Sequence, residues 1–235
     1  MHATIDHVAV AVPDLERAEQ RWVGELGATR VAGPHANRVF TNEQVVFANG
    51  ARLELLQPTP DAPSPNFVRR YLDRFGAGIQ HVTLLVDELR PAVQELRDAG
   101  FEAVDVHDEH EHWHEAFLRP SQVGGLVVQV AWTSRGRQAR QASTAAAAQG
   151  PALLGPTLRH PDLEHARRLW ALLGAQVEGD GDHILASWAD APLSVVVERG
   201  EPAGPIGLRF ADAPALDSDP ELGAAVLPRP ALARP

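Results

Sequence analysis

The sequence predicts an α+β protein built from copies of one β-α-β-β-β module. A strand-like segment recurs at a fixed spacing, because Ile5-Asp6-His7-Val8 returns as Ile79-Gln80-His81-Val82, and 81 − 7 gives 74. Pro13-Asp14-Leu15 returns as Pro161-Asp162-Leu163, and 161 − 13 gives 148, twice that period. In each copy a helical stripe follows the strand and ends at a glycine, and strand-forming residues come next.

The first module occupies residues 1–74. His7 to Val12 alternate in the way typical of a strand. Asp14 can cap a helix that Gly27 ends, and residues 38–57 then have strand propensity. The apolar stripe of this helix has i, i+3 and i+4 spacing and consists of Leu15, Ala18, Trp22 and Leu26.

The second module, residues 75–133, repeats this order. His81 to Val86 form the strand, a helix runs from about Leu89 to Ala99, and strand propensity returns at 103–106 and 115–132. One module alone leaves an apolar sheet face exposed to water, so two modules are expected to pair. Residues 1–133 are therefore predicted to form one domain.

Residues 134–151 are rich in Ser, Ala and Gln and are predicted to be a linker. A third module spans about 152–199, and Ile206 to Phe210 looks like the first strand of a fourth that fades into a Pro/Ala-rich tail. We expect residues 152–235 to be a degenerate, truncated second copy. Its role could be to cover an apolar face of the first domain, to make a homodimer contact or to wall the mouth of the active site.

Composition excludes several classes of function. The chain has no cysteine, so a metal must be held by nitrogen and oxygen donors. All 21 basic residues are arginine, which excludes a lysine Schiff base. The net charge of −10 argues against nucleic acid. No apolar run approaches the ~20 residues that cross a membrane, and no secretory signal opens the chain, so a cytoplasmic location is expected.

Four polar residues fall at matching points of the repeat. His7 matches His81, and Glu54 matches Gln129, where 129 − 54 gives 75. A single histidine on a strand is more often a core residue than a ligand, but this matched set predicts one divalent metal site shared by two modules. Nitrogen and oxygen donors suit Co, Ni, Mn, Zn or Fe(II).

The same positions in the C-terminal copy carry different residues. Gly155 matches His7, the match of His81 is near Gly207, and that of Glu54 is about Ser194. We therefore expect residues 152–235 to be free of a metal site of this kind.

Four segments carry a resemblance to a known family, and it covers about residues 4–132. The chain resembles the vicinal oxygen chelate superfamily, which includes glyoxalase, extradiol dioxygenases and fosfomycin-resistance proteins, and most of all its methylmalonyl-CoA epimerase-like branch. This resemblance implies a curved, cup-like mixed sheet with flanking helices and a small-molecule substrate. The segments are 5–15, 53–58 with 64–67, 76–82, and 117–120 with 124–129.

The resemblance also implies that His7, Glu54, His81 and Gln129 face into the cup and hold the ion. The epimerases usually have glutamine where this chain has Glu54 and glutamate where it has Gln129, so the two have exchanged places. A second glutamate of those enzymes falls near Phe40, with Glu43 out of register. We therefore expect one catalytic base, Glu54.

The remaining candidates have common alternative explanations. His112, His114 and Glu115 belong to a charged segment, 107–115, that is either a solvated loop or a lid whose side chains serve as acid/base groups or a second ion site. Three arginines could bind a substrate carboxylate, although each is more often a surface residue. They are Arg38, Arg52 and Arg119.

These residues together predict a metal-dependent isomerase, epimerase or lyase. The reaction would remove a proton next to a metal-chelated carbonyl of a small oxygenated acid or its thioester. One alternative is a mononuclear Fe(II) dioxygenase with His7, His81 and Glu54 as its 2-His-1-carboxylate set. The other is a non-catalytic ligand-binding or resistance protein.

Overall fold

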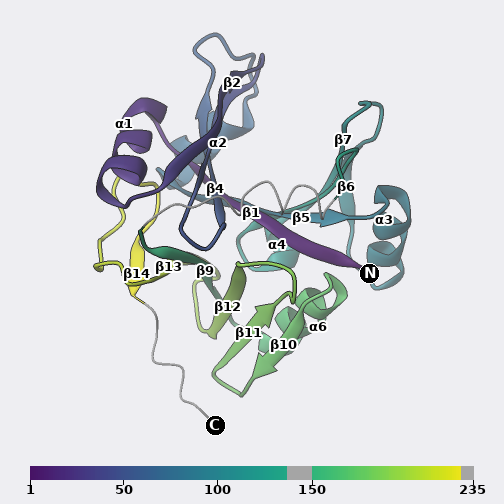
Figure 1. Cartoon of the computed structure of the whole chain (residues 1–235). Helices are drawn as coiled ribbons and strands as arrows, with labels where there is room; N and C mark the ends of the chain where they lie inside the picture. The colour runs from purple at the N-terminus through teal and green to yellow at the C-terminus, as the bar shows by residue number, and fades with distance from the viewer. Residues whose placement is uncertain (137–149, 229–235) are drawn as a thin grey trace.

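The computed structural model describes residues 1–136 and 150–228, so most of the predicted linker, 137–149, lies outside the described residues (Figure 1). Its strands form one sheet of eight and one of six. The elements are β1 (Ala3–Ala11), α1 (Leu15–Glu19), η1 (Gln20–Glu25), β2 (Thr29–Ala36), β3 (Phe40–Val46), β4 (Arg52–Pro58), α2 (Phe67–Phe75), β5 (Gly78–Val86), α3 (Leu89–Asp98), β6 (Ala103–His107), β7 (Trp113–Leu118), α4 (Pro120–Val123), β8 (Val127–Thr133), β9 (Ala152–His160), α6 (Leu163–Leu172), β10 (Gln176–Gly179), β11 (His183–Ser187), β12 (Ser194–Arg199), β13 (Gly204–Ala211) and β14 (Val226–Pro228).

The eight-stranded sheet consists of two copies of one arrangement. Its order is β2-β3-β4-β1-β5-β8-β7-β6. β1 and β5 are antiparallel at the centre, while β4 is parallel to β1 and β8 is parallel to β5. The second module therefore repeats the first about a pseudo-twofold axis between β1 and β5, and the predicted α+β fold of paired modules is confirmed.

The first helix differs in detail from the sequence prediction. It is α-helical only over α1 and continues as the π-helical η1, where Leu26 N–H bonds the Arg21 carbonyl at 3.2 Å. α2 was not expected at all, although Asn66 caps its N-terminus and Gly76, at φ +75°, ends it. Among the described residues, no helix is long and apolar enough to cross a membrane.

The six-stranded sheet repeats the order of the first and then stops. Its order is β10-β11-β12-β9-β13-β14, in which β9 and β13 are the antiparallel pair and β14 runs parallel to β13. β13 and β14 thus correspond to β5 and β8. Within residues 150–228, the fourth module has neither the helix nor the two outer strands of the others.

Strand register shows which residues of the second sheet replace the metal-site candidates. Ala9 pairs with both His81 and Glu54, and Thr157 pairs in the same way with Gly207 and Val196. The counterpart of Glu54 is therefore Val196. Counting along the sequence, which indicated about Ser194, was wrong by two residues because the loops before the two strands differ in length.

A buried arginine lies beside the position that matches His7. Gly155 pairs with Arg209, as His7 pairs with Thr83. The Arg209 guanidinium donates to the backbone oxygen and Oγ of Ser194, at 2.7 and 2.9 Å, and burial lowers its pKa to about 10. Gly155 has φ +111°, and a Cβ there would lie 2.1 Å from the Ser194 carbonyl oxygen, so no histidine fits.

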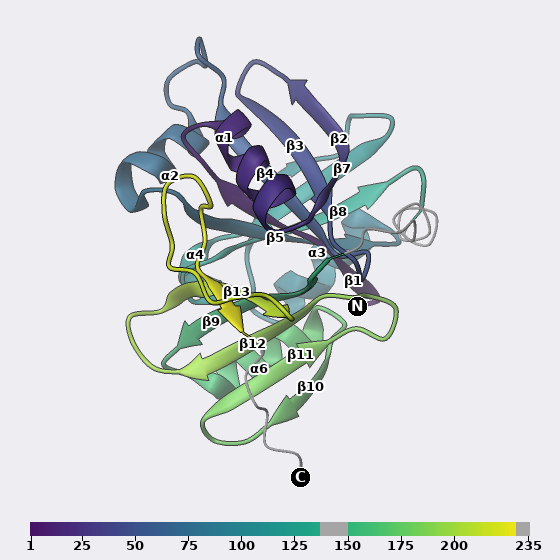
Figure 2. The ribbon, with the colours of Figure 1, turned by 60° about the vertical axis from the view of Figure 1, so that its left-hand side comes forward.

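The two sheets share one hydrophobic core. The buried Trp22 indole stacks on Phe210 of β13, with 6.1 Å between ring centroids, and meets Phe47 edge-on at 6.0 Å. Its Nε1 donates to the Leu222 carbonyl at 3.1 Å. In Figures 1 and 2 the yellow C-terminal segment lies against α1, and the second sheet lies below the first. Residues 150–228 thus cover the face of the first sheet that bears α1 and α3.

Removal of the Trp22 indole, which packs against both sheets, should destabilise the two sheets together. We expect Trp22→Ala to lower the free energy of unfolding by about 3–5 kcal/mol, because it leaves a cavity where both sheets meet. Urea unfolding followed by far-UV circular dichroism should show one transition, shifted to lower urea. Trp22→Phe, which keeps a ring but loses the hydrogen bond to Leu222, should lose less. Two separate transitions, of which only one moves, would contradict the shared core.

Candidate metal centre

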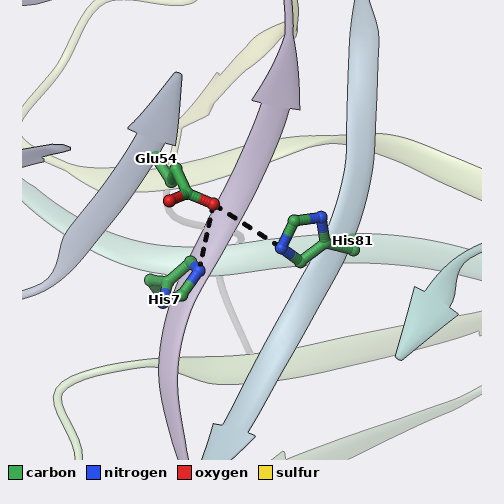
Figure 3. Close-up of side chains that lie close together, drawn as sticks. All are labelled: His7, Glu54 and His81. Atoms are coloured by element: carbon green, nitrogen blue, oxygen red, sulfur yellow. Dashed lines mark ion pairs between the residues drawn. The ribbon is translucent and has the colours of Figure 1, made fainter. Parts of the chain in front are cut away.

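His7, Glu54 and His81 come from three neighbouring strands, β1, β4 and β5, and their side chains converge (Figure 3). The Nε2 atoms of His7 and His81 lie 3.4 and 3.7 Å from the same Glu54 oxygen, Oε2. One ligand atom from each residue lies within 4.8 Å of the others, and all three residues are buried. The structure therefore brings together three of the four predicted metal ligands.

Two β-bulges orient the histidine rings. Asp6 is the extra residue of β1, between Ile5 and His7, and Gln80 is the extra residue of β5, just before His81. A bulge turns a side chain that would otherwise point to the opposite face of the sheet. The Asp6 carboxylate lies 2.7 Å from His7 Nδ1, and Gln80 Oε1 is hydrogen-bonded to His81 Nδ1. Both rings therefore direct Nε2 toward Glu54.

The three side chains perturb one another's ionisation. Burial alone would lower the pKa of His7, but the Glu54 and Asp6 carboxylates raise it to about 9. Burial alone would raise the pKa of Glu54, but the charge on His7 and hydrogen bonds from His7 and Asn42 lower it to about 2. Burial lowers the pKa of His81 to about 4, with Glu54 opposing and His7 adding to the shift. The carboxylate is thus ionised, as a metal ligand must be, whereas His7 carries a proton that metal binding would release.

Amide groups on β3 hold the second oxygen of Glu54. Asn42 Nδ2 donates to Oε1 at 2.7 Å and Gln44 Nε2 at 3.4 Å. Because these donors occupy Oε1, Oε2 is the oxygen that faces the histidines.

Gln129, on β8, is linked to the cluster through Thr83. The Thr83 hydroxyl donates to Gln129 Oε1 at 2.5 Å and lies 3.0 Å from His7 Nε2. Gln129 Nε2 donates to Glu115 Oε2 at 2.7 Å, and Trp113 Nε1 donates to the same oxygen at 2.8 Å. The amide oxygen thus lies on the His7 side and the amide nitrogen on the Glu115 side.

A cavity of about 950 Å³ opens above these residues, and all of its lining residues lie between positions 7 and 129. Its walls combine aromatic and aliphatic side chains with a few polar groups. Phe40 and Phe67 meet edge-on there, with 5.7 Å between ring centroids. Since none of the lining residues belongs to 150–228, the second sheet does not wall the active-site mouth within the described residues.

Only some residues of the charged segment 107–115 line this cavity. Glu115 lines it, but His112 and His114 do not. His114 points to the opposite face of β7 and stacks on Trp132, with 4.4 Å between centroids, because neighbouring residues of a strand alternate in direction. His112 is exposed and lies 3.1 Å from Ser134 Oγ. Neither histidine therefore lines the cavity, as an acid/base role there would require.

Of the three predicted substrate-binding arginines, only one lines the cavity. Arg119 lines the cavity at its rim, where it pairs with Glu102 at 3.4 Å. Arg52 is buried outside the lining and pairs with Asp6 at 3.3 Å, so it supports the His7 contact instead of meeting substrate. Arg38 is exposed, and its neighbours Asn37 and Val39 line the cavity in its place.

Several site residues were missed because their patterns depend on strand pairing. Phe40, Asn42 and Gln44 share one face of β3 and line the cavity, whereas Glu43 faces the other way and pairs with Arg30. Arg70 enters from α2, the helix that was not expected. An i, i+3, i+4 stripe of Val68, Tyr71 and Leu72, after the capping Asn66, could have indicated this helix.

The donor set fits a divalent ion. His81 Nε2 is buried and has no hydrogen-bond partner within residues 1–136 and 150–228, although such atoms are nearly always paired in a folded protein. Two imidazoles and one ionised carboxylate, with Nδ1 of each ring already engaged, are a common ligand set for Zn, Mn, Co, Ni or Fe(II). The same arrangement leaves further coordination positions open toward the cavity.

Loss of one donor should abolish metal binding without changing the fold. We expect His81→Ala to lose stoichiometric Co²⁺, measured by elemental mass spectrometry after reconstitution, together with the rise in melting temperature that Co²⁺ gives wild type. His114→Ala is the matched control, because this histidine lies on the outer face of the cup and should bind Co²⁺ like wild type. Equal Co²⁺ content in His81→Ala and wild type would contradict the site.

The chain is similar to proteins of the same superfamily. The glyoxalase-like domain family matches residues 5–174. Bovine mitochondrial methylmalonyl-CoA epimerase is 32% identical over 131 residues, which cover 54% of this chain and 72% of that protein. Ethylmalonyl-CoA/methylmalonyl-CoA epimerase of Cereibacter sphaeroides is 29% identical over 136 residues, covering 55% and 98%.

A solved structure extends the likeness to both sheets. A hypothetical protein from Staphylococcus aureus covers 97% of this chain with 100% of its own, at a TM-score of 0.69 and 13% identity, which shows a shared fold. The family match spans the whole metal centre and runs into the second sheet. The chain therefore belongs to the glyoxalase-like family of the vicinal oxygen chelate superfamily, with its N-terminal half in the methylmalonyl-CoA epimerase-like branch.

Proposed function

We propose that this protein is a metal-dependent isomerase of the epimerase type, which removes and returns a proton at the carbon next to a carbonyl. The observation that carries the proposal is a pair of carboxylates, Glu54 and Glu115, that line one cavity from different modules. An epimerase needs a proton-transfer group on each face of the reacting carbon. The strands of the two buried histidines, β1 and β5, lie between β4, which carries Glu54, and β7, which carries Glu115.

Strand register explains the origin of the second carboxylate. In the first module Asn42 pairs with Leu56, two residues after Glu54; in the second, Glu115 pairs with Ala131, two residues after Gln129. Glu115 therefore holds the position of Asn42. The amide of Asn42 donates to Glu54, and the amide of Gln129 donates to Glu115. The first module thus has an amide at Asn42 and a carboxylate at Glu54, and the second has a carboxylate at Glu115 and an amide at Gln129, so the cup has two carboxylates.

The ion would be held by His7, Glu54 and His81, with Gln129 as a fourth ligand. When bound, a divalent ion supplies Lewis acidity that polarises the substrate carbonyl and stabilises negative charge on its oxygen. The protein's own residues position the substrate and move the proton.

The two carboxylates differ in how their oxygens are engaged. Glu54 is held ionised, so it can accept a proton. Both protein donors to Glu115 bind Oε2, and Oε1 has no hydrogen-bond partner among the described residues. Oε1 is therefore available for proton transfer at the face of the carbon opposite to Glu54.

The cavity suits an acyl thioester better than a small free acid. Its volume of about 950 Å³ is near the upper end of the range of roughly 300–1,000 Å³ typical of ligand pockets. The relatives are named for methylmalonyl-CoA and ethylmalonyl-CoA. Arg70 lines the cavity and forms no ion pair with the described residues, and Arg119 lies at the rim. These arginines could bind anionic groups of such a substrate.

One alternative uses the same donors. His7, His81 and Glu54 match the 2-His-1-carboxylate set of mononuclear Fe(II) oxygenases. An oxygenase has no need of Glu115, whereas an epimerase does, so we favour the epimerase. Oxygen consumption by the Fe(II)-loaded protein with a catechol substrate would support the alternative.

The two carboxylates can be tested separately by hydrogen exchange. With methylmalonyl-CoA in D₂O and Co²⁺-loaded protein, we expect Glu54→Gln to slow exchange at the α-carbon by roughly 10²–10⁴-fold, because the base is lost. Glu115→Gln should retain exchange for one epimer but lose conversion to the other. Proton NMR of the thioester and chiral analysis of the hydrolysed acid give the two rates.

The exposed Glu111, outside the cavity lining, supplies a matched control. Glu111→Gln should exchange and epimerise like wild type. Equal rates for Glu54→Gln and wild type, or no exchange of any acyl thioester by the loaded wild type, would remove the proposal.

Arg70 should affect binding more than turnover. We expect Arg70→Ala to raise KM for the thioester about 10-fold, or ~1.4 kcal/mol, with kcat nearly unchanged, because an anion contact far from the reacting carbon stabilises substrate and transition state alike. Steady-state kinetics measures both constants. Arg69→Ala, one position along α2 and outside the lining, is the control. An unchanged KM in Arg70→Ala would show that the anion binds elsewhere.

A further inference from the structure

We infer that Thr83 is a positioning residue that fixes the rotation of the Gln129 amide, so that its oxygen faces the metal site. The inference rests on the proposed metal centre, and it assigns a role to a side chain that ligates nothing itself. Thr83 is fully buried, and its hydroxyl lies between Gln129 Oε1, at 2.5 Å, and His7 Nε2, at 3.0 Å.

The hydrogen-bonding capacities of the neighbours select one amide orientation. Glu115 Oε2 accepts from Trp113 Nε1 and again from Gln129, so the Gln129 atom that faces it is the NH₂ group. The amide oxygen then faces Thr83, whose hydroxyl has one hydrogen and donates it to that oxygen. A rotation of the amide by half a turn would set its oxygen against the Glu115 carboxylate and leave the hydroxyl hydrogen facing an NH₂ group. Thr83 and Glu115 therefore favour the same rotamer.

Strand pairing places Thr83 where it can act on both sides. It lies on β5, two residues after His81 and on the same face of the sheet. It pairs with His7 of β1 on one side and with Gln129 of β8 on the other. Its hydroxyl thus joins a histidine of the first module to the amide of the second.

Comparison with the first module explains why only the second module needs a hydroxyl at the position of Thr83. The counterpart of Thr83 is Ala9, which pairs with Glu54 as Thr83 pairs with Gln129. A carboxylate presents an oxygen to an ion whichever way it turns, whereas an amide presents oxygen in one orientation and NH₂ in the other. The Ala9/Thr83 difference therefore matches the Glu54/Gln129 exchange.

The test is Co²⁺ binding by full-length Thr83→Val and Thr83→Ser. Valine keeps the branched shape and removes the hydroxyl, so we expect Co²⁺ affinity, measured by competition with a chelator, to fall roughly 10–100-fold. The visible spectrum of bound Co²⁺ should change as an oxygen ligand is lost, and Thr83→Ser should restore both. A wild-type affinity and spectrum in Thr83→Val would overturn the inference.

A double-mutant cycle separates positioning from general packing. If Thr83 acts through Gln129, Thr83→Val should cause no further loss of Co²⁺ affinity in a Gln129→Ala background. A further loss there would mean that the hydroxyl acts by another route and would contradict the inference.

The outcomes for the metal centre and for Thr83 can be told apart. Loss of Co²⁺ by His81→Ala but not by Thr83→Val leaves the metal centre intact and removes only the positioning role. A wild type that binds no Co²⁺ removes both. The expected affinity and spectral changes in a protein that epimerises no thioester would support the positioning role and count against the proposed reaction alone.

Discussion

The antiparallel pairing of β1 with β5, bulged at Asp6 and Gln80, is the constraint on which the metal centre depends. Without the bulges, these two side chains would point away from the histidines that follow them, because neighbouring residues of a strand alternate in direction. With the bulges, each Nδ1 gains a partner inside the sheet and each Nε2 turns to the centre. Arg52 in turn pairs with the Asp6 carboxylate, so a buried charge that would be costly alone is compensated.

Pseudo-twofold symmetry explains how a carboxylate can change sides without loss of the site. The two last strands, β4 and β8, flank the histidine strands equivalently, so Glu54 and Gln129 approach the same centre from opposite sides. Each of them needs a complementary neighbour, because a buried carboxylate requires donors and a buried amide requires both an acceptor and a donor. Asn42 and Glu115 supply these partners in exchanged positions.

Much of the fold and three metal-site residues could be predicted from sequence, because the repeat places equivalent residues at equal spacing. His7, His81 and Glu54 were found in this way and do converge. The partners Asn42, Gln44 and Thr83 could not be found, since their role depends on which residues face each other across strands, and hairpin loops of unequal length hide that register. The same reason accounts for Arg52, a good substrate-binding candidate by charge that strand pairing instead places against Asp6. α2 was missed because it lies between the repeated segments and has no counterpart in the periodicity.

The second sheet has different residues at the positions of the candidate metal ligands. At the position of His7 the chain has Gly155, whose backbone approaches the Ser194 carbonyl too closely for any side chain, and Arg209 hydrogen-bonds to that same carbonyl. Beside this position the second copy holds a cation of its own chain, the Arg209 guanidinium, on backbone and hydroxyl oxygens. Its apolar face is used for the core shared with Trp22 and Phe47, on the side of the first sheet that bears α1 and α3. Stability and the proposed chemistry are thereby assigned to opposite faces of the first sheet. Because the cavity lining and the shared core lie on opposite faces, side chains of the cup can change without disturbing the packing that holds the two sheets together.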